Sequence, residues 1–209
     1  MSGAGGIQQG PVQFVPAKSV KDAEIYIKDV IGVSADLGSI ESVTIANNIA
    51  EELYTLSQKM GGFTVELTGG ETVSVLNKIK TSSLSMDTMA EYNYAKRQIN
   101  LNEKIFSSAE NYKKYGSRFK ESLVNANPKA VIDHEIAHGF TALDTELFNI
   151  RKEIYNKYSD DAISKYSLHS AEEMVSEAFV HFLDYGKLPP ELKKLTPIFN
   201  RILSTGVKI

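Results

Sequence analysis

The chain has 209 residues, of which 42% are hydrophobic and 23% charged, ordinary values for a globular protein of one large domain. Lys and Arg number 23 against 26 Asp and Glu, so there is no net positive field to attract nucleic acid or an anionic membrane, and no apolar run is long enough to cross a bilayer. The absence of cysteine excludes disulfides, thiol nucleophiles and thiolate zinc sites, and leaves His, Asp and Glu as metal ligands.

The first eleven residues are rich in glycine and lack the apolar core of a secretory signal. We therefore expect a flexible leader over 1–13 and a single domain over 14–209. The missing signal predicts a protein that is cytoplasmic as made. Presence in a virion, or delivery as part of a larger protein, is the alternative.

The first half of the chain predicts two helices followed by strands. Apolar spacing predicts helices over 18–30, with Ser19 as N-cap, and over 42–59, ended by Gly61 and Gly62. Alternating apolar residues and turn residues predict two strand pairs, over 63–67 with 72–76, turning at Gly69-Gly70, and over 88–94 with 98–101.

From residue 103 onward the pattern predicts helices, over 103–124, 128–141, 143–158, 170–184 and 190–204. Strands thus come early and helices late. This order predicts an α+β fold, with a small mixed sheet early in the chain packed on a mainly helical C-terminal half.

One predicted helix carries the pattern H-E-x-x-H, at His134, Glu135 and His138, after an N-cap at Asn127 and a proline at 128. At about 100° per residue the two histidines lie about 40° apart on one face, so both rings reach one zinc ion. Glu135 lies beside them, where it takes a proton from a water activated by the ion and passes it to the leaving amine. A chance match is disfavoured because two of only four histidines fall on this apolar helix.

A catalytic zinc takes a third protein ligand and keeps one open position. One known extension of the motif places that ligand at position 144, here Asp144, but needs a glycine at 141, here threonine. The later helix offers Glu172, Glu173 and, one turn on, Glu177. Glu173 as ligand, with Glu177 holding a histidine ring N–H, fits the pattern.

The choice of Glu173 has two rivals. Ser170-x-x-Glu173 is also a capping box, in which Glu173 only satisfies a backbone donor. Glu172 is adjacent and equally early in the helix, and helical periodicity does not choose between the neighbours. A solvated acidic face is the simpler interpretation of Glu177.

The H-E-x-x-H motif, together with a second segment over 166–179, resembles the catalytic core of the anthrax lethal factor-like gluzincins. This group includes the clostridial Pro-Pro endopeptidases. In that group the second segment reads Tyr, six residues, Glu, three residues, Glu-Ala-Phe. This sequence reproduces it at Tyr166, Glu173, Glu177, Ala178 and Phe179.

The resemblance implies a zincin-like metalloprotease fold that binds one catalytic Zn²⁺. It implies that His134, His138 and Glu173 bind the ion, that Glu177 supports a ligand and that Tyr166 stabilises the oxyanion. The chain is also similar to peptidases of phage and prophage head proteins, through Phe14-Val-Pro-Ala-Lys18 and through Tyr94 followed by a strand ending Ile99-Asn-Leu-Asn102. That likeness implies a phage or mobile-element origin, with phage structural proteins as partners.

The sequence thus predicts a zinc metalloendopeptidase acting on a protein or peptide. The strand over 98–102 is a candidate sheet edge that pairs with an extended substrate, with contacts from Gln98, Ile99, Asn100 and Leu101. An ordinary sheet strand is the equal alternative.

Two other functions stay open: a non-catalytic zinc-binding domain associated with a phage or toxin, and a helical interaction protein with a chance motif and no zinc. Glu135 favours the enzyme, because a site without turnover needs no base. Of the remaining histidines, we expect His169 in a surface loop and His181 in a structural role.

Overall fold

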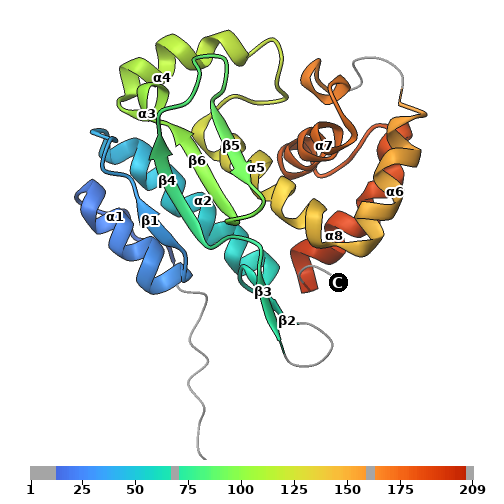
Figure 1. Ribbon diagram of the computed structural model, residues 1–209, viewed down its shortest axis with the longest axis horizontal. Coiled ribbons are helices and arrows are strands. Elements are labelled where there is room, and N and C mark those ends of the chain that lie inside the picture. Colours follow the sequence, from blue (N-terminus) through green and yellow to red (C-terminus); the bar gives the residue numbers. More distant parts are fainter. Residues whose placement is uncertain (1–12, 67–70, 159–162, 206–209) are drawn as a thin grey trace, which may run out of the picture.

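The computed structural model describes residues 13–66, 71–158 and 163–205 (Figure 1). Residues 1–12 of the predicted leader over 1–13, and the predicted turn at Gly69-Gly70, lie outside the described residues. Four strands form one mixed sheet in the order β1-β4-β6-β5, and two more form a separate antiparallel hairpin. In chain order the strands are β1 (Ser34–Asp36), β2 (Thr64–Glu66), β3 (Thr72–Ser74), β4 (Lys78–Ser82), β5 (Ala90–Asn93) and β6 (Gln98–Asn102).

The strand order contradicts the predicted sheet edge. Strand β6 lies between β4, its parallel neighbour, and β5, its antiparallel neighbour, so both of its hydrogen-bonding sides are occupied. All five of its residues are buried. Gln98, Ile99, Asn100 and Leu101 therefore form an interior strand and cannot receive a peptide by strand addition. Among the described strands, the edges of this sheet are β1 and β5.

Two early helices form where the sequence predicts them. Helix α1 (Val20–Tyr26) begins after the Ser19 cap and continues as a π-helical turn over Ile27–Ile31. Helix α2 (Val43–Met60) ends where Gly61 adopts φ 72°, a left-handed conformation that glycine accepts without a steric cost. Figure 1 shows α2 and α5 behind the sheet, and α2 also contacts α1, α5 and α8.

The predicted helix over 103–124 is wrong. The structure has α3 (Glu103–Phe106), α4 (Ala109–Gly116) and a 3₁₀ turn over Ser117–Phe119. The break falls at Ser108, whose Oγ accepts a hydrogen bond from the N–H of Asn111 at 3.1 Å and so starts a new helix. An irregular loop then leads to α5.

The C-terminal helices agree with the prediction to within a few residues, except that the last one begins as a 3₁₀ helix. They are α5 (Pro128–Leu143), α6 (Thr145–Tyr155), α7 (Ala171–Tyr185), the 3₁₀ segment Pro190–Leu195 and α8 (Thr196–Thr205). One continuous apolar cluster joins the sheet to these helices. The α+β class with a small mixed sheet is thus confirmed. No helix among the described residues combines the length and apolar character that crossing a membrane requires.

Candidate metal centre

Helix α5 carries the H-E-x-x-H pattern and is fixed by both its cap and its apolar face. The Asn127 side chain accepts a hydrogen bond from the N–H of Ala130 at 2.9 Å, and Pro128 occupies the first turn, as predicted. Ile132, Ile136 and Phe140 are fully buried. Since these residues anchor one face in the core, the opposite face presents the two histidines and Glu135 in a fixed direction.

Gly139 brings α5 close to the edge strand β5. A Cβ atom at this position would lie 3.0 Å from three atoms of the Tyr92 side chain, tighter than ordinary carbon contacts. The glycine thus lets the Tyr92 ring pack directly on the helix backbone. As a result the outer strand of the sheet lies beside the helix that carries the histidines.

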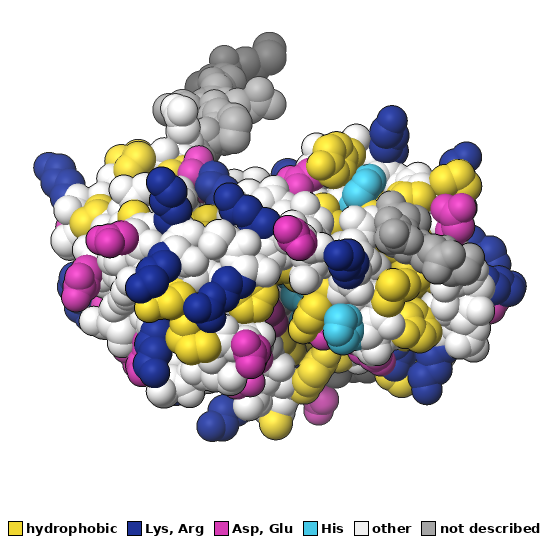
Figure 2. Space-filling model, turned by 90° about the horizontal axis from the view of Figure 1, so that it is seen from above, with side chains coloured by type: hydrophobic (Ala, Val, Ile, Leu, Met, Phe, Trp, Pro, Cys, Tyr) yellow, Lys and Arg dark blue, Asp and Glu magenta, His cyan; other side chains and the backbone are white. Residues whose placement is uncertain are grey.

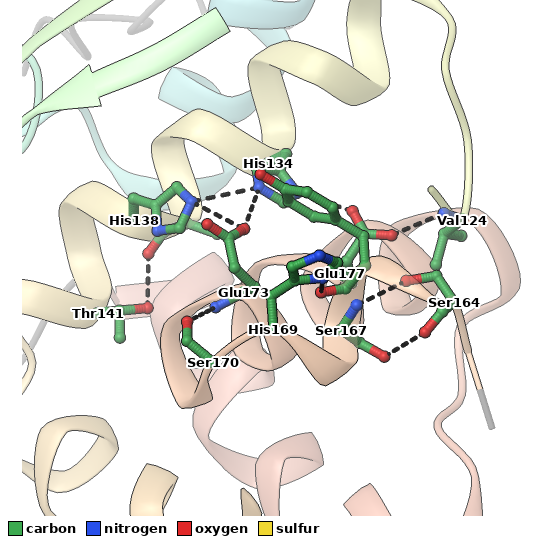
Figure 3. A network of polar contacts seen from close by, with 12 residues as sticks. Val124, His134, His138, Thr141, Ser164, Ser167, His169, Ser170, Glu173 and Glu177 are labelled. Atoms are coloured by element: carbon green, nitrogen blue, oxygen red, sulfur yellow. Dashed lines mark hydrogen bonds and ion pairs between the residues drawn. The ribbon is translucent and has the colours of Figure 1, made fainter. Parts of the chain in front are cut away.

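Three side-chain atoms converge in front of α5 (Figure 3). The Nε2 atoms of His134 and His138 are 3.2 Å apart, and the Glu173 Oε2 lies 2.9 Å from the first and 3.4 Å from the second. Tetrahedral zinc bound at about 2.0–2.1 Å holds its ligand atoms about 3.3–3.4 Å apart. The spacing and the donor set of two imidazoles and a carboxylate therefore suit one zinc ion.

Glu173 reaches the histidines from the first turn of α7. Ser170 caps this helix, accepting a hydrogen bond from the Glu173 N–H at 3.1 Å. The Glu173 carboxylate does not complete the capping box, because it points to the two rings instead. The Glu173 side chain therefore does not act as the acidic partner of a capping box.

The rival ligands are engaged elsewhere. Glu172 accepts a hydrogen bond from the Arg151 Nε at 3.0 Å. Asp144 is fully buried, caps α6 through the N–H of Leu147 and forms an ion pair with Arg201 at 2.8 Å. Neither carboxylate belongs to the group of donors that converge on one point.

Glu177 holds the outer nitrogen of His134, as the sequence predicted. Its Oε1 lies 2.8 Å from the His134 Nδ1, and its Oε2 accepts a hydrogen bond from the Val124 N–H at 2.7 Å. The residue is only 1% exposed, so both oxygens depend on these partners. A proton held on Nδ1 by this carboxylate leaves the Nε2 lone pair free for a metal.

The site attracts positive charge. Burial would lower the pKa of His134, but hydrogen bonds to Glu173 and Glu177 raise it to about 10. Burial would raise the pKa of Glu173, but its bonds to His134 and His138 lower it to about 2. Without a metal, a protonated His134 therefore pairs with the ionised Glu173, and a divalent cation bound at the same nitrogen would displace that proton.

Glu135 is buried beside the histidines. Burial raises the pKa of its carboxyl group, although both imidazoles oppose the shift. A carboxylate with a raised pKa is a stronger base. Glu135 lines a pocket of about 50 Å³, room for a few waters, whose apolar walls include Met89, Phe119, Leu123 and Val131.

Tyr166 lies at the same pocket, in the 3₁₀ turn Tyr166–Leu168. Its backbone N–H donates to the Ser122 carbonyl at 2.9 Å, and its ring centroid is 5.9 Å from that of His134. Burial, reinforced by the nearby Glu173 and Glu135, raises the pKa of the phenol to about 12. The side chain therefore keeps its proton and can donate a hydrogen bond into the pocket.

The other two histidines lie outside the donor cluster. His169 is exposed, with its Nδ1 3.0 Å from the carbonyl oxygen of Tyr166, which agrees with the expected surface position. His181 Nδ1 lies 3.0 Å from the carbonyl oxygen of Lys187, close to the end of α7.

Sequence reasoning missed a partner of His138. The Tyr94 hydroxyl lies 3.2 Å from the His138 Nδ1, although 44 residues separate the two in the chain. Burial, with Glu173 and Glu172 nearby, raises the pKa of this phenol to about 12, so it is protonated at neutral pH. Chemistry alone predicts that some partner exists, because a histidine that binds a metal through one nitrogen usually hydrogen-bonds through the other. Spacing along the chain does not name that partner.

Figure 2 shows a hollow near the middle of one face, with histidine and acidic side chains visible in its depth and hydrophobic side chains along its walls. The chain matches no protein-family model, and it is similar to none of the curated proteins or solved structures with which it was compared. The geometry of the site therefore carries the functional argument by itself.

Proposed function

We propose that this protein is a zinc metalloendopeptidase of the gluzincin type, with a zincin-like fold. The observation that carries the proposal is the convergence of two imidazole nitrogens and the Glu173 carboxylate within 3.4 Å of one another, beside the buried Glu135. His134, His138 and Glu173 would hold the ion. A zinc ion bound there supplies a Lewis acid that acidifies water and polarises a peptide carbonyl.

The protein's own groups provide proton transfer and charge stabilisation. Glu135, buried beside the two imidazoles, accepts the proton of the attacking water and passes it to the leaving amine. Tyr166, protonated at neutral pH, donates a hydrogen bond to the developing oxyanion. Glu177 keeps His134 in the tautomer that leaves its Nε2 lone pair free.

The substrate is an extended peptide. Strand β5 is an outer strand of the described sheet and packs against α5, so its free side offers backbone hydrogen bonds near the histidines. We therefore propose β5 as the peptide-binding strand, in place of β6, which is an interior strand. The pocket next to Glu135 is small and has a partly apolar wall, which favours a small side chain close to the bond that is cut. The expected phage origin and phage structural partners stay predictions.

The test compares wild type with Glu135→Gln, using Glu172→Gln as a matched control. Metal analysis should give one zinc per chain in all three proteins. In a peptide-library assay, Glu135→Gln should lower kcat by about 10²–10⁴-fold and Glu172→Gln should leave it near wild type.

The other results separate the alternatives. Zinc in every protein with cleavage in none would indicate a non-catalytic metal-binding domain. No zinc in the wild type would indicate a chance motif. Cleavage by Glu135→Gln at the wild-type rate would remove Glu135 from the mechanism.

A further inference from the structure

The two metal-facing histidines receive different support at their outer nitrogens. His134 has the Glu177 carboxylate, which is 1% exposed and comes from α7. His138 has the Tyr94 phenol, which is 50% exposed and follows directly after the edge strand β5. One ligand is thus supported by the helical half and the other by the sheet.

Packing fixes the Tyr94 ring although half of it is exposed. Its centroid lies 5.2 Å from that of Tyr92, at an interplanar angle of 76°. Tyr92 is in turn wedged against the α5 backbone at Gly139. The Tyr94 ring also meets the His138 ring edge-on, with centroids 6.3 Å apart. These contacts hold the hydroxyl at 3.2 Å from the His138 Nδ1.

The direction of this hydrogen bond follows from metal binding. When the Nε2 lone pair of a neutral imidazole binds a metal, its proton sits on Nδ1, so His138 becomes the donor and the Tyr94 oxygen accepts. A neutral phenol is a weaker acceptor than a carboxylate. His138 is therefore the more weakly held of the two histidines, and its orientation depends on the sheet edge.

We propose that Tyr94 is a positioning residue that orients His138 and thereby sets the affinity of the centre for a divalent metal. This inference rests on the proposed function, since it takes the three-ligand site as given. It adds a link between the edge strand that would bind the peptide and the metal itself.

The test removes one oxygen atom, with Tyr94→Phe, and measures Zn²⁺ affinity by competition with a chelator. The control is Tyr155→Phe, which loses a hydroxyl that donates to the Leu168 carbonyl at 2.7 Å. We expect Tyr94→Phe to weaken zinc binding about 10- to 100-fold, the range found for partners of metal-binding histidines. Tyr155→Phe should bind zinc as the wild type does.

Two further readouts separate positioning from stability. Thermal unfolding in EDTA should give the same Tm for Tyr94→Phe and wild type, and the visible spectrum of the Co²⁺-loaded protein should change only in Tyr94→Phe. Equal zinc affinity in wild type and Tyr94→Phe would overturn the proposal for Tyr94 alone. A lower Tm in EDTA with unchanged affinity would do the same, while a wild type that binds neither ion would overturn the metal centre as well.

Discussion

The two faces of α5 are both buried, but different forces hold them. On the core face, Phe140 is 0% exposed and packs edge-on against Phe179 of α7, with ring centroids 4.8 Å apart. On the site face, His134 and His138 are 8% and 7% exposed and depend on Glu173, Glu177 and Tyr94 for polar partners. One face of the helix is thus held by apolar packing and the other by polar and charged partners, so substitutions on each face should have different consequences.

The largest expected effect lies on the core face. Phe140→Ala removes a buried ring and leaves a cavity among Phe179, Phe199 and their neighbours, so we expect a loss of about 3–5 kcal/mol in the free energy of unfolding. Urea denaturation in EDTA measures it. The control Phe148→Ala, at a residue 51% exposed, should cost at most about 1 kcal/mol. Similar losses in the two variants would mean that Phe140 is not part of a packed core.

On the site face, the largest effect is expected from Glu173, the proposed third metal ligand. Structural zinc sites bind with about 10–16 kcal/mol over four ligands, so removing one ligand costs about 2.5–4 kcal/mol, or on the order of 10²–10³-fold in affinity. Glu173→Gln should show this loss in a chelator competition. In EDTA it should also lower the urea stability, because it removes a charged partner of the protonated His134. Glu172→Gln should bind zinc as the wild type does. Equal losses of zinc affinity in Glu173→Gln and Glu172→Gln would mean that Glu173 is not the specific ligand.

A smaller effect is expected for Glu177→Gln. The amide keeps the shape of the carboxylate but provides a weaker, neutral partner for the His134 Nδ1, so zinc affinity should fall about 10- to 100-fold. Isothermal titration in parallel with wild type measures the change. Unaltered affinity would reduce Glu177 to a structural residue that only ties down the Val124 N–H.

The smallest expected effect is the release of one proton when zinc binds. Because the pKa of His134 is about 10 in the metal-free protein, the ring is protonated at pH 7.5 and must release its proton when a metal binds. Titrations in buffers of different ionisation enthalpy should give about one proton released per zinc, with affinity rising as pH rises. Metal binding without proton release would contradict the ion pair between His134 and its carboxylates.

The same pKa predicts how the metal-free fold responds to pH. The folded value of about 10 lies above the usual histidine value of 6.5. The ion pair therefore stabilises the fold fully up to about pH 6.5 and loses that contribution as pH rises towards 10. At the acid end the contribution is lost as Glu173 protonates, from about pH 4.5 down to about pH 2. The site face thus contributes to folding through charge, whereas the core face contributes through packing at every pH.

Local patterns predicted α5, α7 and their donor residues well. Caps such as Asn127 and Ser170 and the i, i+4 spacing of His134 and His138 act within a few residues, so the sequence reveals them directly. Convergence of Glu173 on the histidines followed from the resemblance rather than from spacing.

The sheet could not be predicted in the same way. Strands β1 and β4 were missed because β1 has only three residues and β4 buries a single side chain, Ile79. Without β4, the strand β6 appeared to be an edge, although it is enclosed on both sides. Strand order depends on pairings between distant segments, and so does the contact between Tyr94 and His138.

The central claim is that His134, His138 and Glu173 bind one ion. Anomalous scattering at the zinc edge, from crystals grown with one equivalent of Zn²⁺, tests it most directly. We predict a single strong peak about 2.0–2.2 Å from both Nε2 atoms and from a Glu173 carboxylate oxygen. A difference map without a peak between these three side chains, or with zinc bound by other residues, would contradict it.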